Sequence, residues 1–264
     1  MNKVAFTPRL YSPNSALAEY RERIKLRVQY PESDGEPVAE STVQFRWIMT
    51  IHGNLEILFS EDSRVFVAGD LLWYPVEGSN TIRMAPDVMV AFGAFKGDRG
   101  AYMQWREGGI APQVVFEILS PGNRKAEMEN KFAFYERYGV EEYYVYDPGR
   151  GLLNGWLRNR QGKLVAIPEM NDWISPRMSI RFALEQKELV LFYPDGTRFP
   201  NVIELGKQRA EAQQEASEAR LQLDEAETKA EQAQLQAEQE ARRAEQAEAK
   251  LRELEEKLRA AGLS

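Results

Sequence analysis

The sequence predicts an α/β protein with a mixed β-sheet, followed by a long C-terminal helix. One observation is the strand–helix–strand order over residues 113–146, which implies a parallel strand pair joined by a helical crossover. Another is an abrupt change of composition near residue 200, beyond which the chain has no proline and no aromatic residue. We therefore expect an N-terminal arm over 1–37, a folded domain over 38–200 and a helical tail over 201–264.

Composition limits the chemistry that this chain can carry out. The 264 residues include no cysteine and one histidine, His52, which excludes thiolate nucleophiles and Cys-based zinc sites and disfavours a Ser–His–Asp triad. Any catalysis must rely on carboxylates, lysine, arginine, tyrosine or serine, with a hard metal ion as a further option. The longest apolar runs fall well short of the roughly 18 residues that span a membrane, so we expect a cytoplasmic protein without a membrane segment.

The first half of the domain contains one helix and three β-rich stretches. Apolar residues recur at helical spacing over 38–59, which predicts an amphipathic helix. The stretch 64–74 is rich in β-forming residues and predicts a strand pair or one long strand, and 82–92 predicts a strand interrupted by Pro86. The run QVVFEIL at 113–119 predicts a buried strand.

The second half of the domain also contains one helix together with several strands. A helix is expected over 124–138, with Gly139 as its C-terminal cap. The run EYYVY at 142–146 predicts the next strand. Two hairpins follow, at 154–167 and at 189–199, the second of them around Pro-Asp-Gly.

The tail is predicted to be helical and carries a heptad repeat. Nine of its 14 core heptad positions are alanine, four are leucine and one is Glu240, so the seam buries little apolar area except near its end. Favourable i,i+4 pairs such as Glu253–Lys257 would support the helix by themselves. The tail is therefore either a solvated spacer helix or a coiled coil that pairs with a second copy or another protein.

Two acidic residues stand out because they lie in apolar, β-rich surroundings. Asp87 follows a proline in APDVMV, and Glu117 lies within the strand QVVFEIL. An ionised carboxylate in such a strand is costly unless a neighbouring group neutralises it. Lys131, two turns into the following helix, can reach back over the end of that strand. These three side chains would suit a hard divalent cation, although a structural Glu117–Lys131 ion pair with Asp87 in a turn explains them equally well.

The run PDVMV, followed by VVFEILSPGNRKAEMENKFAFYERYGVEEYYVYDP, resembles the Uma-type restriction endonucleases of the PD-(D/E)XK nuclease superfamily. The resemblance covers roughly 38–200. It implies a restriction-endonuclease-like core that hydrolyses the phosphodiester bonds of DNA with the help of Mg²⁺ or Mn²⁺.

The resemblance also assigns roles to individual residues. Asp87 corresponds to the Asp of the PD motif and Glu117 to the Glu of the E-x-K element, and both would be metal ligands. The usual lysine position holds Leu119, so Lys131 on the following helix is the substitute. Glu40 on the first helix would be an extra metal ligand, or else an acid that stabilises the start of that helix. Independently of the resemblance, the helical spacing of Tyr135 and Tyr138 favours packing in the core over stacking on nucleic-acid bases.

A second hypothesis from a different class remains open. The displaced lysine and the near-neutral charge of the chain before the tail are also typical of a non-catalytic interaction module. Such a module would have kept the nuclease fold and would recruit a partner through its tail.

Overall fold

The computed structural model describes residue 18, residues 21–22, 25, 28–35 and 39, and residues 41–260 apart from the side chains of 258 and 259. Most of the predicted arm therefore lies outside the described residues. The backbone contacts divide the chain into two compact units, Met1–Val202 and Ile203–Ser264.

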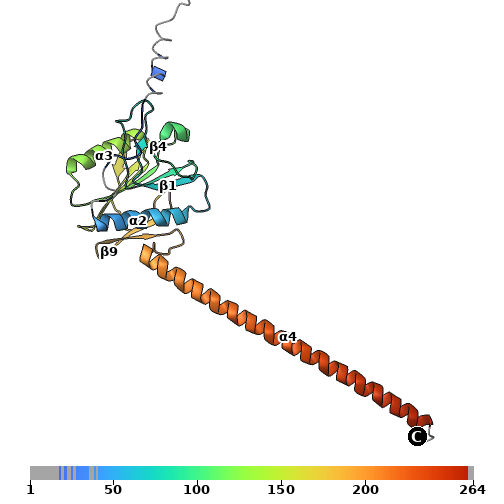
Figure 1. Cartoon of the computed structure of the whole chain (residues 1–264). Helices are drawn as coiled ribbons and strands as arrows, with labels where there is room; N and C mark the ends of the chain where they lie inside the picture. The colour runs from blue at the N-terminus through green and yellow to red at the C-terminus, as the bar shows by residue number, and fades with distance from the viewer. Residues whose placement is uncertain are drawn as a thin grey trace, which may run out of the picture. The chain divides into compact units, whose positions relative to one another are not determined.

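A six-stranded mixed sheet lies at the centre of the first unit (Figure 1). Its strand order is β1-β3-β5-β6-β7-β8. The central pair β5–β6 is parallel and the other neighbours are antiparallel, which confirms the predicted mixed sheet with a helical crossover. The strands are β1 (Val65–Gly69), β3 (Val88–Phe92), β5 (Val114–Ile118), β6 (Glu142–Asp147), β7 (Leu152–Arg158) and β8 (Leu164–Ala166).

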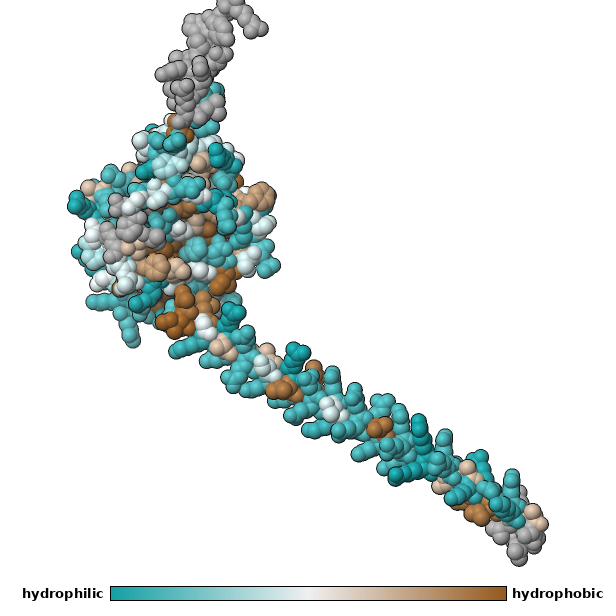
Figure 2. Space-filling view, viewed as in Figure 1, coloured by the Kyte–Doolittle hydropathy of each residue, from teal (hydrophilic) through white to brown (hydrophobic). Residues whose placement is uncertain are grey.

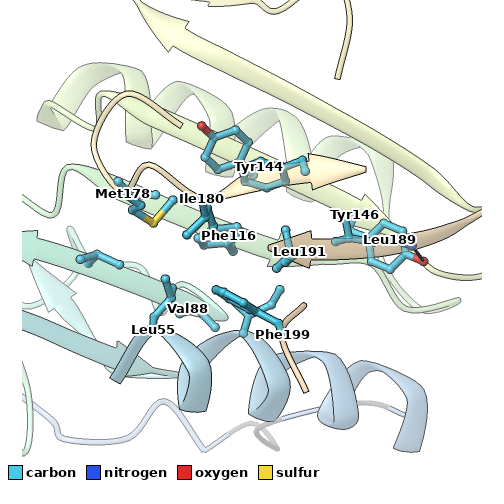
Figure 3. Close-up of a cluster of buried hydrophobic side chains, with 14 of the residues drawn as sticks. Leu55, Val88, Phe116, Tyr144, Tyr146, Met178, Ile180, Leu189, Leu191 and Phe199 are labelled. Atoms are coloured by element: carbon cyan, nitrogen blue, oxygen red, sulfur yellow. Dashed lines mark hydrogen bonds between the residues drawn. The ribbon is translucent and has the colours of Figure 1, made fainter. Parts of the chain in front are cut away.

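One face of this sheet is covered by helix α2 (Thr42–Leu58) and by the hairpin of β9 (Arg181–Glu185) and β10 (Glu188–Phe192). The helix begins at Ser41, whose hydroxyl accepts a hydrogen bond from the Gln44 N–H at 3.1 Å, as a helix cap does. Figure 3 shows the resulting apolar layer, in which Leu55 of α2 and Leu191 of β10 lie with sheet residues such as Phe116.

The opposite face is covered by helix α3 (Lys125–Tyr138), and α2 and α3 lie on opposite sides of the sheet (Figure 1). The helix ends at Gly139 in the left-handed region, with a φ of 102°, as predicted for a glycine cap. Its buried Tyr135 packs with Val115 and Tyr143 of the sheet. Because strand residues alternate between faces, Glu117 of β5 lies on this α3 side, whereas its neighbours Phe116 and Ile118 belong to the α2 side.

One prediction about the strands needs correction. The stretch 64–74 holds two strands that do not pair with each other, because the chain turns at Asp70, where φ is 49°. The second strand, β2 (Trp73–Tyr74), pairs with β4 (Tyr102–Met103), which leads into the short helix η1 (Gln104–Glu107).

The predicted hairpin at 189–199 is present but short: Phe192 bridges Arg198, and backbone hydrogen bonds join Tyr193 to Thr197 and Phe199 to Leu191. A further hairpin, which was not predicted, joins β9 to β10 through Gln186 and Lys187, which both adopt positive φ values of 51° and 69°. Such a turn normally carries Asn or Gly, so its sequence gave no turn signal.

The second unit is a single helix, α4 (Val202–Ala260), which confirms the predicted long C-terminal helix. Residues 206–257 are all exposed. Among the described residues, no helix combines the length and apolar character required to cross a membrane.

Candidate functional site

The two predicted acidic residues meet across neighbouring strands. In the antiparallel register of β3 and β5, Val88 pairs with Phe116, so Asp87 lies opposite Glu117. The Ile118 N–H, next to Glu117, donates a hydrogen bond of 2.6 Å to the Asp87 carboxylate. Asp87 is 8% exposed and Glu117 only 2%. The sheet therefore holds two buried carboxyl groups side by side at the end of the β3–β5 pair.

Helix α3 supplies the partners of Glu117. The Lys131 Nζ lies 2.7 Å from Glu117 Oε2, and the Tyr135 hydroxyl donates to Glu117 Oε1 at 2.5 Å. Lys131 and Tyr135 are four residues apart, so both side chains lie on the same face of the helix. Each oxygen of the Glu117 carboxylate thus has its own donor. Tyr135 packs in the core, as predicted, and has a polar role that its spacing did not indicate.

Burial and neighbouring charges shift the pKa values of all three groups of the site. Burial, followed by the nearby Glu117 carboxylate, raises the pKa of Asp87 to about 8, although Lys131 opposes the rise. Burial also raises the pKa of Glu117, against the effect of Lys131 and Tyr135. Burial alone would lower the pKa of Lys131, but the carboxylates of Glu117 and Asp87 outweigh it and raise that pKa to about 12. Near neutral pH, Asp87 is therefore protonated, and the Lys131 ammonium group lies against Glu117.

Two further polar residues border the site and were not identified from the sequence. The Gln44 side chain donates to the Ile118 carbonyl at 2.9 Å and also hydrogen-bonds Asp87. Asp70 comes at the end of β1, and its N–H donates to the carbonyls of Pro86 and Asp87. Burial and the nearby Asp34 raise the pKa of Asp70, and Lys131 lowers it, so Asp70 is within electrostatic reach of the site.

The structure thus brings Asp87, Glu117 and Lys131 together, whereas Glu40 lies outside the described residues. Within the part of the chain that the structure describes, no group of three or more His, Asp or Glu side chains is arranged to hold a metal ion. Asp87 and Glu117 are the carboxylates that could contribute oxygen ligands.

A family model described as "Uma2: Putative restriction endonuclease" matches residues 17–189, which is more than half of the chain. The chain belongs to the Uma2 family. A crystal structure of "a putative nuclease belonging to DUF820" from Anabaena variabilis is similar to this Uma2 chain, with 14% sequence identity and a TM-score of 0.40. That similarity covers 57% of this chain and 85% of the other. A search of curated proteins found no match.

In this Uma2 chain a helix provides the ammonium group of the site. Leu119, two residues after Glu117, takes the position where the PD-(D/E)XK pattern has its lysine, and the Leu119 N–H pairs with the Tyr146 carbonyl. Lys131 reaches the same carboxylate from α3, as was expected from the sequence.

A cavity of about 900 Å³ opens beside the site, where β5 and β6 end and α2 and α3 begin. Leu119 lines this cavity, and so do the cationic side chains of Arg124, Lys125 and Arg150. Lys125 and Arg150 form loose ion pairs of 3.7 Å with Glu129 and Asp147, whereas Arg124 makes no ion pair with any described residue. The cavity thus offers positive charge beyond the end of β5, and Leu119 is the lining residue nearest in sequence to Glu117.

Proposed function

We propose that this Uma2 chain is a metal-dependent endonuclease that hydrolyses DNA phosphodiester bonds at Asp87, Glu117 and Lys131. The observation that carries the proposal is the pair of buried carboxyl groups at opposite positions of the β3–β5 end, with the Lys131 ammonium group bonded to Glu117 and within electrostatic reach of Asp87. With a single cation beside two buried acids, Asp87 holds a proton near neutral pH. A divalent cation bound by the carboxylate oxygens would take the place of this proton, and hard oxygen donors are the ligands that Mg²⁺ and Mn²⁺ prefer.

Each side chain then has a defined task. Asp87 and Glu117 would hold Mg²⁺ or Mn²⁺, with Glu40 as an additional carboxylate. When bound, such an ion would lower the pKa of a water molecule and stabilise charge on the phosphoryl oxygens. Lys131 orients the attacking water or offsets negative charge in the transition state. Tyr135 fixes the orientation of the Glu117 carboxylate.

The cationic side chains of the neighbouring cavity would bind the substrate. DNA is a polyanion, and arginine and lysine contacts to phosphate position it without reading its sequence. Arg124 is the strongest candidate, since it is exposed and makes no ion pair with a described residue. Lys125 and Arg150 would exchange their loose ion pairs for phosphate contacts.

Metal binding can be tested by thermal unfolding of the full chain. We expect Mg²⁺ or Mn²⁺ to raise the melting temperature of the wild type. At a metal concentration a hundredfold above Kd, binding adds about 2.7 kcal/mol to the free energy of unfolding. Glu117→Gln should abolish the rise. Glu142→Gln is the matched control, because Glu142 is also a buried strand carboxylate but is bonded to Tyr144, Ser175 and Arg177 outside the site. The same metal response in both variants would contradict the assignment.

Cleavage of plasmid DNA tests the catalytic roles. Asp87→Ala and Glu117→Ala should each lose nearly all hydrolysis, because they remove a ligand of the ion. Lys131→Ala should lower the rate on the order of 10²–10⁴-fold, the range for a positioned proton-handling group. Equal cleavage by the wild type and Glu117→Ala would refute the proposed mechanism.

One observation favours the alternative of a non-catalytic interaction module. Glu117 is almost fully buried, and both of its oxygens already accept hydrogen bonds from Lys131 and Tyr135. A carboxylate in this state serves as a structural ion pair without any metal. The absence of both a metal-linked shift in melting and cleavage would favour this alternative.

A further inference from the structure

Helix α4 presents an unpartnered surface along nearly its whole length. It has 59 residues, and its large apolar side chains remain exposed, among them Leu223 at 58%, Leu251 at 60% and Leu254 at 58%. Figure 2 shows apolar side chains as small separate patches along an otherwise hydrophilic helix. Helices in proteins owe most of their stability to the packing of an apolar face. We therefore expect a partner to cover the exposed apolar side chains of α4.

The apolar side chains of its C-terminal half follow a heptad repeat. Ala244, Ala247, Leu251 and Leu254 occupy successive a and d positions, spaced alternately by three and four residues. This spacing brings them onto one stripe of the helix, as in a coiled-coil seam. Alanine at the seam leaves a narrow core. Two helices can close around such a core, whereas three or four would enclose a void.

The charges that flank this stripe have opposite signs on its two sides. The g positions hold the cations Arg243 and Lys250, and the e positions hold the acids Glu248 and Glu255. In a parallel pair, each g residue meets the e residue five positions later on the other helix. Arg243 would therefore meet Glu248 of a second copy, and Lys250 would meet Glu255, so that both contacts are attractive.

An antiparallel pair of the same helices would be opposed by charge. There g residues face g residues and e residues face e residues, which, when residues 244–254 of the two helices overlap, sets Arg243 and Lys250 against cations and Glu248 against an acid. Like charges at such positions disfavour a pairing. The surface is thus complementary to itself in one orientation only.

We propose that α4 binds a second copy of this chain as a parallel, two-stranded coiled coil centred on residues 244–254. This inference is independent of the proposed nuclease activity, because it rests on α4 alone. In a parallel pair, both chains enter the coil at the same end, so the two folded bodies are attached to neighbouring helix ends.

The absence of cysteine from the chain makes a clean test possible. Ala244→Cys places one thiol at an a position of the seam, where a parallel, in-register pair brings it against its own copy. Ala249→Cys, five residues later at an f position, is the matched control that points away from the seam. Under mild oxidation of the full chain, we expect covalent dimers from Ala244→Cys and far fewer from Ala249→Cys.

Charge exchange tests the flanking contacts in the same full-length protein by sedimentation equilibrium. The pair R243E/K250E and the pair E248K/E255K should each weaken self-association at least tenfold, because every g–e contact becomes repulsive. An equimolar mixture of the two should associate again. Helicity at 222 nm distinguishes loss of pairing from loss of the helix.

Several outcomes would overturn the proposal. A single-chain mass for the wild type at all concentrations would exclude pairing, and a mass of three chains would exclude the two-stranded form. A dimer mass without cross-linking of Ala244→Cys would exclude the parallel register. Dimerisation of both charge variants as strong as that of the wild type would show that another surface mediates it.

Discussion

Two glutamate–lysine pairs of this chain have nearly the same geometry in very different surroundings. Glu117 and Lys131 are 2.7 Å apart in the folded body, and Glu253 and Lys257 are 2.6 Å apart on helix α4. The side chains of the first pair are 2% and 14% exposed, and those of the second are 62% and 69% exposed. Distance alone would rank the two pairs as equals.

Burial separates the two pairs energetically. Water and salt screen an exposed pair, which contributes little to stability. A buried pair has lost the hydration of both charges, so that each partner depends on the other. The body therefore contains charges that cannot be removed singly without a large cost, whereas α4 contains charges that can be exchanged freely. This difference is what makes the buried pair a candidate for chemistry and the exposed charges candidates for partner selection.

Replacing the lysine of each pair should give the largest difference in the free energy of unfolding. Lys131→Met leaves Glu117 buried without its cation, so we expect a loss of about 3–5 kcal/mol in the free energy of unfolding. Tryptophan fluorescence during urea unfolding measures it, and reports on the body alone because no aromatic residue follows residue 199. The matched variant Lys257→Met should lower the free energy of unfolding by about 0.5 kcal/mol or less. Helicity at 222 nm measures this loss. Similar losses in both variants would contradict the comparison.

The pH dependence of stability should reveal the second buried acid. The pKa of Asp87 is about 8 in the folded chain and about 3.9 when unfolded, so between these values the folded state binds a proton that the unfolded state does not. Stability should therefore fall as the pH rises from about 4 to about 8, by up to roughly 1.4 kcal/mol per pH unit. Asp87→Asn should flatten this profile and be more stable than the wild type near pH 8. Parallel profiles would show that Asp87 does not carry the proton.

A pair of buried tyrosines sharpens the comparison within the body. Tyr135 donates to Glu117, whereas the buried Tyr143 hydroxyl has no hydrogen-bond partner among the described residues. Tyr135→Phe should cost about 1.5–3 kcal/mol, the range for a hydrogen bond to a charged group. Tyr143→Phe should be close to neutral, because it removes no bond. Urea unfolding measures both, and equal losses would mean that packing, not the carboxylate contact, decides the effect.

Local patterns in the sequence were sufficient to predict the main elements of the fold and the three residues of the candidate site. Glu117 was identified because a charge within an apolar strand requires a neutralising partner, and Lys131 because helical periodicity returns it to that strand. The pairing of Asp87 with Glu117 follows from the register of β3 and β5, which places them opposite each other.

Features that depend on distant contacts could not be predicted in the same way. Asp70 reaches the site only because β1 pairs with β3, and Gln44 because α2 crosses the end of β5. The sequence around Asp70 or Gln44 does not indicate either contact. The turn at Gln186–Lys187 was missed for a different reason: residues other than Asn and Gly adopt positive φ there, so the sequence carries no turn signal.

Deletion of α4 should give the smallest effect on the body. The unit boundary lies after Val202, and the contacts that close the end of the body, such as the Asn54 side chain to the Pro200 carbonyl at 2.9 Å, precede it. A chain ending at Asn201 should keep its free energy of unfolding within about 0.5 kcal/mol of the full chain, since distant sites contribute independently. It should also sediment as a single chain, because the seam has been removed. Loss of cooperative unfolding would show that α4 belongs to the core, and dimers of the shortened chain would place self-association on the body.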